Sequence, residues 1–321
     1  AIAQNLLNGN GYCSVPGQPT AFRPPLYPLL VAACLSVGGP ILIGAVQTLF
    51  GAVTVWLTYR LARCCQFSHR TGLLAAGLVA VDPLLIMYTA EVMTETLFTF
   101  LVTSLLAVSL WQAQGAWKGV VVGLLFGITA LCRPSIWAFG ALAVVGWLAS
   151  VVVGGRIAAG GEGSIIRDDR WYRLKMGAAC AVTVAVTVSP WVLRNALQFD
   201  SPILMTTHGG YTLRLGNNST FYREVVQGRS GTVWDGASLR AWQAEQEQLL
   251  AGMGISPHDE IARDAAFRRL AQEWMVANPV AFLRSSVLRV QRFWACRPSV
   301  SSGIPSVIVI AVSINTLGSP L

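Results

Sequence analysis

The feature that most limits the possible folds is a series of long apolar runs that follow one another between Ile41 and Leu193. Most of these runs approach the length of about 20 residues that a transmembrane helix needs. The chain is 54% hydrophobic and 12% charged, whereas a soluble domain typically carries about 25% charged residues. We therefore expect an integral membrane protein whose fold is an all-α, multispanning bundle.

The apolar runs predict where the chain crosses the membrane. Six runs are long enough, or nearly so: Ile41–Leu61, Thr71–Thr89, Thr96–Trp111, Gly119–Cys132, Ile136–Val153 and Met176–Leu193. The run from Leu26 to Val37, which Gly38-Gly39-Pro40 closes, is too short to cross, so we expect a juxtamembrane helix there. Ala1–Leu7 is a second short amphipathic helix, followed by a loop that contains Pro16, Gly17 and Pro19.

Composition divides the chain into three parts. Residues 1–193 form the transmembrane core, with juxtamembrane helices in 1–38; residues 194–303 are more polar and form a mostly helical domain; residues 304–321 begin a further span. The polar domain contains helical patterns at 238–250 and 259–277, the second preceded by Ser256-Pro257 as cap and first-turn residue. Residues 279–294 place an apolar face opposite Arg284, Arg289 and Arg292, which suits a helix on the membrane surface. Residues 154–170 read as a flexible linker.

The first residue is not Met and lies within a predicted helix, and the last lies within an apolar run. We interpret the sequence as a fragment that lacks its first span.

The positive-inside rule predicts which side of the membrane each connection faces. One group of connections holds nine basic residues: Arg60, Arg63, Arg70, Lys118, Arg156, Arg167, Arg170, Arg173 and Lys175. The other group holds Arg23, Arg133 and Arg194. The first group is therefore expected on the cytoplasmic side. Glu91, Glu95, Arg133-Pro134 and the polar domain then face the extracytoplasmic side.

Two carboxylates, Glu91 and Glu95, lie where one apolar run ends and the next begins. Four residues apart, they would share a face if one helix held both. Acidic groups are costly in the hydrocarbon core, so we expect the pair at the membrane rim or in a wet cavity, where a carboxylate is a candidate for function. The alternative is that Glu95 only favours the positive end of the helix that starts at Thr94-Glu95-Thr96. Asp82-Pro83, deeper in its run, is interpreted as structural.

Several other classes of site have little support in the sequence. The net charge of +8 is spread between apolar runs instead of forming a basic stripe, so nucleic acid is not an expected partner. The seven cysteines contain no C-x-x-C, and the three histidines belong to no H-x-x-x-H pattern. We predict no dedicated metal site, and a need for a divalent metal stays open.

Five short motifs, in order along the chain, carry a family resemblance. They are Ala1–Tyr12, Arg23-Pro-Pro-Leu-Tyr-Pro-Leu-Leu30, Met93-Thr-Glu-Thr-Leu-Phe98, Leu131-Cys-Arg-Pro-Ser135 and Pro190-Trp-Val-Leu-Arg-Asn195. Together they resemble GT-C glycosyltransferases of the protein-mannosyltransferase and aminoarabinose-transferase kind, over most of residues 1–220. The resemblance implies transfer of a sugar from a polyprenyl-phosphate carrier to a glycan, lipid or protein acceptor, outside a plasma (inner) membrane of the cell envelope.

The resemblance also implies roles for particular residues. It matches Glu95 to the family's second outer acidic position and Arg23 to the basic residue that contacts the carrier phosphate, and it places a first acidic residue just before Ala1. We take Glu95 and Glu91 as candidate catalytic residues, and Arg23, Arg133 and Arg194 as candidate ligands of the carrier phosphate, because a guanidinium pairs well with phosphate oxygens. Each arginine is otherwise a headgroup anchor. Candidate substrate-binding residues are Tyr27, His208 and Asn217, although 208–218 also reads as a glycine-rich turn.

Two rival functions stay open at this point. A transporter or flippase of lipid-linked substrates tends to place charge near the midplane between repeated halves, and this chain shows rim charge without an evident repeat. A non-catalytic homologue is the other. The sequence names neither the sugar nor the acceptor.

Overall fold

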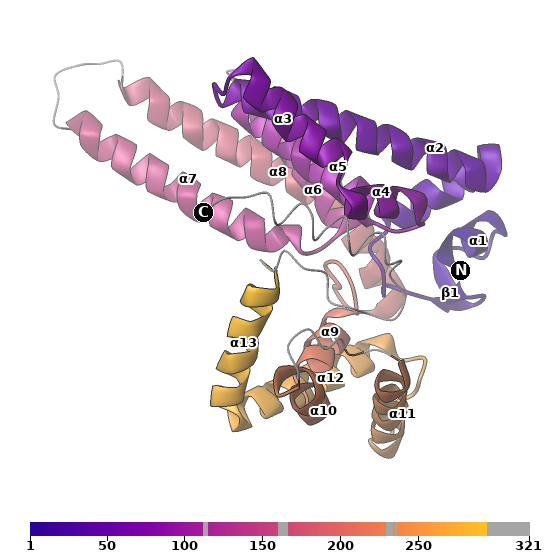
Figure 1. Cartoon of the computed structure of the whole chain (residues 1–321). Helices are drawn as coiled ribbons and strands as arrows, with labels where there is room; N and C mark the ends of the chain where they lie inside the picture. The colour runs from indigo at the N-terminus through magenta and orange to yellow at the C-terminus, as the bar shows by residue number, and fades with distance from the viewer. Residues whose placement is uncertain (112–114, 160–165, 229–233, 235, 294–321) are drawn as a thin grey trace. The chain divides into compact units, whose positions relative to one another are not determined.

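The computed structural model describes residues 1–111, 115–159, 166–228, 234 and 236–293 (Figure 1). The described chain is almost wholly helical, which confirms the all-α prediction. The contacts between residues divide the chain after Thr206 into two units. The composition predicted a domain boundary at residue 194, which lies inside a helix that continues to Phe199. The predicted further span at 304–321 lies outside the described residues.

The first unit is a bundle of long apolar helices with a small hairpin near its start (Figure 1). In chain order its elements are α1 (Ile2–Leu7), β1 (Cys13–Val15), β2 (Gln18–Pro19), α2 (Leu26–Cys64), α3 (His69–Ala80), α4 (Pro83–Ala90), α5 (Glu95–Leu110), α6 (Ala116–Cys132), α7 (Ile136–Ala159) and α8 (Ile166–Phe199). The antiparallel pair β1 and β2 replaces the predicted loop, because Pro16 and Gly17, with its φ of +79°, suit a type II turn.

α2 contains a sharp kink that separates its first three turns from the rest. Gly39 has a φ of 66° and a ψ of −160°, which interrupts the helix, and Pro40 begins the second part. The predicted short helix over Leu26–Val37 and the predicted run from Ile41 are thus both present, joined end to end.

Asp82 interrupts the next predicted span. Its carboxylate accepts hydrogen bonds from the backbone N–H groups of Leu84 (2.9 Å) and Leu85 (3.0 Å), so it caps α4, and Pro83 takes the first helical position. The structural interpretation of Asp82 is confirmed. α3 and α4 are bent by 49° at this point.

Helices α6 and α8 pack against each other along a seam of glycines. A Cβ atom added at Gly119 would lie 2.2 Å from the Met176 carbonyl oxygen, and one at Gly123 would lie 2.5 Å from the Cys180 carbonyl oxygen. A Cβ atom added at Gly127 would lie 2.7 Å from the Cβ atom of Thr187. Glycines at this four-residue spacing let two backbones touch, as they do in many transmembrane helix pairs.

Two apolar clusters join α2, α5, α6 and α8 in the first unit. One lies between α2, α5 and the end of α6, with Tyr27, Leu97 and Cys132 among its buried members. The other joins α5, α6 and α8 through Leu105, Ala130 and Val188. α5 thereby packs between α2 and α6.

Within the described residues, α2 and the part of α8 from Trp171 to Phe199 are each long and apolar enough to cross a membrane, and the bent pair α3–α4 qualifies if counted as one span. The predicted runs Ile41–Leu61, Thr71–Thr89 and Met176–Leu193 fall in these helices. The other three runs correspond to apolar helices that are individually shorter. The predicted linker at 154–170 is wrong in part, because α7 continues to Ala159 and α8 starts at Ile166.

The second unit is a small helical domain. Its elements are α9 (Gly209–Gly216), α10 (Ser219–Phe221), the π-helix η1 (Tyr222–Val226), α11 (Gly236–Gly252), α12 (Glu260–Ala277) and α13 (Pro279–Phe293). The helical patterns at 238–250 and 259–277 are confirmed, and the one at 279–294 is confirmed as far as Phe293, where the described residues end. The predicted cap at Ser256-Pro257 is wrong, because Asp259 accepts a hydrogen bond from Ala262 N at 2.9 Å and caps α12.

Candidate active site

The candidate site is organised around the break between α4 and α5. α4 ends at Ala90, Glu91 has an extended backbone (φ −99°, ψ 148°), and α5 begins at Glu95. Glu91 and Glu95 therefore do not share a helix face, which corrects the expectation drawn from their spacing. Glu91 is exposed, whereas Glu95 is partly buried at the start of α5, where its charge suits the positive end of the helix.

Glu95 forms an ion pair with Arg133. The Arg133 Nη1 atom donates to Glu95 Oε1 at 2.9 Å, and the two side chains are 40% and 22% exposed, respectively. The Thr94 hydroxyl also donates to Glu95 Oε2, at 3.3 Å. An ion pair as exposed as this contributes little to stability, so its main effect is to fix the direction of the carboxylate.

Pro134 explains why Arg133 is available for this contact. A residue before proline avoids the helical conformation, and Arg133 has a φ of −146° and a ψ of 125°, so α6 stops at Cys132. The Arg133 guanidinium lies 5.5 Å from the centre of the Phe98 ring, one turn into α5. The start of α5 and the end of α6 thus share one end of the bundle, as the sequence predicted for Glu95 and Arg133.

Gln47 holds the α4–α5 break against α2. Its Nε2 donates to the carbonyl oxygens of Thr89 and Glu91, both at 2.8 Å, and its Oε1 accepts from the Tyr27 hydroxyl at 2.6 Å. Gln47 is only 2% exposed. Sequence reasoning missed it, although a lone amide within the apolar run Ile41–Leu61 was a visible signal, because such groups are rarely left without a partner in a membrane.

Tyr27 and Arg23 lie at the other side of Gln47. Tyr27 is buried, and its hydroxyl donates to Gln47. The predicted contact between Tyr27 and substrate would therefore need more than this hydroxyl. Arg23 is exposed four residues before Tyr27, ahead of the start of α2. Its guanidinium lies 5.3 Å from the Phe22 ring, and it makes no ion pair with any described carboxylate. The chain of hydrogen bonds from Tyr27 through Gln47 to Glu91 connects the Arg23 segment with the break that precedes Glu95.

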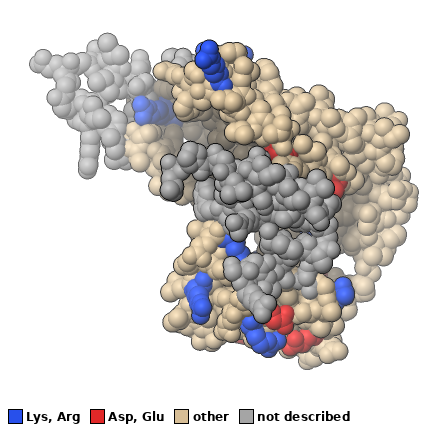
Figure 2. All heavy atoms as spheres, in the orientation of Figure 1, with Lys and Arg blue, Asp and Glu red and all other residues tan. Residues whose placement is uncertain are grey.

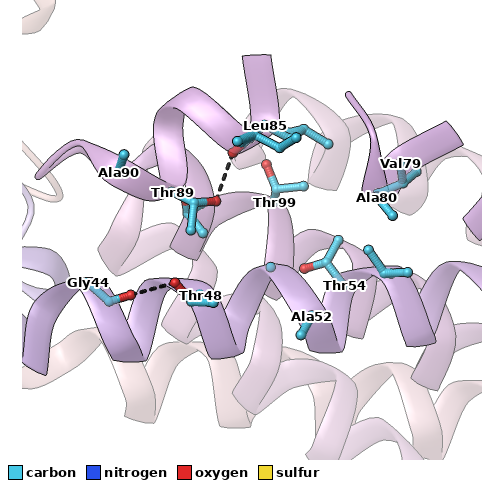
Figure 3. A pocket seen from close by; sticks show the side chains of 14 residues that line it. Gly44, Thr48, Ala52, Thr54, Val79, Ala80, Leu85, Thr89, Ala90 and Thr99 are labelled. Carbon is cyan, nitrogen blue, oxygen red and sulfur yellow. Dashed lines mark hydrogen bonds between the residues drawn. The ribbon is translucent and has the colours of Figure 1, made fainter. Parts of the chain in front are cut away.

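A cavity of about 720 Å³ adjoins the break (Figure 3). Its walls come from α2, α3, α4 and α5 and are mostly apolar, small residues and threonines. Figure 3 shows that the Thr48 and Thr89 hydroxyls bond to carbonyls of their own helices. Thr96 lines the cavity, and its hydroxyl is buried and has no partner in the described part of the chain. Glu95 is the neighbour of Thr96 but does not itself line the cavity.

Arg194 is engaged elsewhere in the first unit. Its guanidinium donates to the carbonyl oxygens of Thr20 (2.9 Å) and Tyr12 (2.8 Å), and it lies over the rings of Tyr12, Trp191 and Phe199. These contacts tie the hairpin segment to the end of α8. The prediction that Arg194 binds the carrier phosphate stays untested, but its visible contacts are structural.

His208 and Asn217 lie in the second unit, at the two ends of α9. The region 208–218 is thus a helix, not the glycine-rich turn considered above. His208 Nδ1 is 2.7 Å from the Thr212 hydroxyl, and the buried Asn217 donates to the Leu213 carbonyl at 2.8 Å. Between them, Arg214 bonds to Gln246 of α11 at 3.0 Å, and burial lowers the pKa of its guanidinium, opposed by Glu245 and Glu273.

Among the described residues, His, Cys, Asp and Glu side chains form no group of three or more that could hold a metal ion. A metal requirement therefore stays untested.

Comparison with known protein families adds to this geometry. Residues 22–159 match the family model described as dolichyl-phosphate-mannose-protein mannosyltransferase. This part of the chain, which is less than half of it, is similar to the protein-mannosyltransferase family. The match confirms the resemblance stated above and indicates a membrane glycosyltransferase. No curated protein and no solved structure matches the chain significantly.

The matched region contains the whole arrangement around the break between α4 and α5. Arg23, Tyr27, Gln47, Glu95 and Arg133 all fall within residues 22–159. Arg194, His208 and Asn217 lie outside it.

Proposed function

We propose that the protein transfers a sugar from a polyprenyl-phosphate carrier to an acceptor on the extracytoplasmic face of the membrane. The observation that carries this proposal is the Glu95–Arg133 ion pair, which lies at one end of a bundle of apolar helices and within the region that matches the mannosyltransferase family. A carboxylate and a guanidinium at that position supply the two charges that the reaction needs.

In this reaction the bond between the anomeric carbon and a phosphate oxygen breaks, and the acceptor hydroxyl oxygen bonds to that carbon. The departing phosphate takes up the bonding electrons and, in the balanced reaction, the proton of the acceptor hydroxyl. Arg133 uses one nitrogen for Glu95, and its remaining donors are free of other described partners, so they suit the growing charge on the phosphate. Glu95 orients the acceptor or a sugar hydroxyl, and the exposed Arg23 adds a second cation.

The cavity beside the break supports the same assignment. Its apolar walls, formed by α2 to α5, suit a hydrocarbon chain better than a free sugar. A lipid-linked donor that places its tail there would bring its headgroup to the end of the bundle that holds Glu95.

Replacement of Glu95 by Gln should abolish transfer, because the neutral amide keeps the shape but loses the charge that Arg133 holds. The measurement is incorporation of label from a radioactive polyprenyl-phosphate sugar into lipid, glycan or protein, in membranes that contain the protein. Glu273→Gln, an exposed carboxylate in the second unit, is the matched control and should transfer normally.

Wild-type turnover in the Glu95→Gln protein would refute the role of Glu95. Movement of label across the membrane without attachment to an acceptor would favour a transporter. Absence of both in the wild-type protein would favour a non-catalytic homologue.

A further inference from the structure

Helix α13 turns its apolar side away from the domain to which it belongs. Val280, Leu283, Val287 and Val290 follow one another at spacings of three and four residues, so they form a single stripe. They are 77%, 63%, 57% and 61% exposed, respectively. We call this set the α13 stripe.

The opposite side of α13 packs on the rest of the unit and is mixed, because it holds Ser285 together with the partly buried Phe282 and Leu288. Ser285 is fully buried, Arg289 donates to the Gly216 carbonyl at the end of α9, and Arg292 donates to the Val225 carbonyl of η1 at 3.5 Å. In a water-soluble domain an amphipathic helix has the opposite orientation, with its apolar face on the core. Because the hydrogen bonds of Arg289 and Arg292 fix the orientation of α13, the stripe is held outward, where something other than water is expected to cover it.

The charge on α13 indicates what kind of surface covers the α13 stripe. Residues 279–293 contain three of the features of an interfacial helix: an apolar stripe, a neighbouring arginine and no acidic residue. Arg284 lies next to Val280 and Val287 on the helix surface, is exposed and makes no ion pair with a described residue. Figure 2 shows basic but no acidic side chains on the visible surface of α13.

The connections of the second unit limit how far α13 can be from a bilayer. The unit follows α8, which is long and apolar enough to span. After α13 an apolar run begins at Ile304, 11 residues beyond Phe293. Even a fully extended chain of that length covers at most roughly 40 Å. If that run enters the membrane, as its composition predicts, then the domain is tied to the bilayer on both sides.

We propose that α13 lies on the membrane surface, with Val280, Leu283, Val287 and Val290 among the lipid chains and Arg284 on the phosphate oxygens of the headgroups. The occupant of the stripe is therefore a lipid leaflet. A second copy of the chain or another protein segment is the alternative that the experiment must exclude.

The test places an environment-sensitive fluorophore on the stripe of the whole protein, reconstituted in lipid nanodiscs. Leu283→Cys and Val287→Cys carry the label in a background in which the exposed Cys64 and Cys65 are serine, and tryptic mapping by mass spectrometry confirms that the label sits only there. Gln272→Cys on α12, which is also exposed, is the matched control. Because Leu283 and Val287 are largely exposed, we expect these substitutions to leave the packing of α13 intact, and circular dichroism checks this.

Nitroxide-labelled lipids should quench the labels at 283 and 287 several times more strongly than the label at 272, and iodide in the buffer should show the reverse order. Iodide quenching of all three labels to the same extent would overturn the proposal. Protection of 283 and 287 from both quenchers would also overturn it, because protein would then cover the stripe.

A second variant tests the role of charge. Arg284→Gln should weaken lipid quenching at 287 in nanodiscs that contain anionic phospholipid, while the exposed Arg269→Gln on α12 should not change it. An equal response of the two variants would refute the contact between Arg284 and headgroups. The readout is the position of a label and not turnover, so its failure is distinct from failure of the proposed sugar transfer.

Discussion

Among single residues, Gln47 has the widest influence on the candidate site, because its amide joins the first turn of α2 to the break before α5. Glu95 and Arg133 carry the charges, but their positions depend on where that break lies. Gln47 touches neither of them, so it acts as a positioning residue.

Replacement of Gln47 by Leu should slow transfer mainly through kcat, because the carbonyls of Thr89 and Glu91 lose their donor and the break moves. Leaving such buried groups unpaired should also cost about 1 to 3 kcal/mol of stability. Initial rates over a range of donor concentrations and thermal unfolding measure both effects. Tyr27→Phe removes one hydrogen bond and keeps both carbonyl contacts, so its loss should be smaller; an equal loss would contradict the positioning role.

Single residues also show how far sequence reasoning reaches. Glu95 and Arg133 could each be chosen, since charge at the end of an apolar run is costly and hence informative. Their pairing depends on how α5 packs on α6, which no local pattern reports. The contacts of Arg194 lie more than 170 positions away in the chain, at Tyr12 and Thr20, and were equally invisible.

At the scale of elements, the glycine seam between α6 and α8 fixes the helix that ends directly before Arg133. The G-x-x-x-G-x-x-x-G pattern at Gly119, Gly123 and Gly127 is present in the sequence and could have predicted a close helix pair. Which helix would be the partner could not be read from it, since α6 and α8 are separated by the whole of α7.

Replacement of Gly123 by Leu should prevent this close packing, because even a Cβ atom would lie 2.5 Å from the Cys180 carbonyl oxygen. We expect a lower unfolding temperature and loss of transfer together, since the end of α6 carries Arg133. Gly146→Leu in α7, where nothing lies within 4 Å of an added Cβ atom, is the control. Normal stability of the Gly123→Leu protein would contradict the seam.

Element boundaries were predictable where proline, glycine or a capping side chain ends a helix, as at Gly39-Pro40 and Arg133-Pro134. They failed where two signals competed. Ser256-Pro257 and Asp259 both suit a helix start, and Asp259 reaches the free N–H of Ala262. Glu91 and Glu95 have helical spacing, yet the backbone at Glu91 is extended, and Gln47 donates to the carbonyl oxygens of Thr89 and Glu91 there.

At the scale of the whole molecule, the arrangement of basic residues predicts the orientation in the membrane. The end of α2 carries Arg60 and Arg63, and the two cysteines that follow them are exposed. The opposite set of connections holds Glu95 and Arg133.

A membrane-impermeant thiol reagent should therefore modify Cys64 and Cys65 only after the membrane is permeabilised. By the same reasoning, a Glu91→Cys protein should be modified at residue 91 in intact cells. Peptide mapping by mass spectrometry assigns the label to each position, and a Cys64→Ser, Cys65→Ser protein is the control. Modification of Cys64 from outside would reverse the predicted topology.

The contact of α6 with α8 has a consequence for motion. Where two backbones touch, no side chains lie between them that could change rotamer. We therefore expect α6 and α8 to move together as one rigid body. Any opening that admits a substrate must then arise elsewhere in the bundle. The short helix α4, whose end is held by hydrogen bonds from the Gln47 amide, is the place where we expect it.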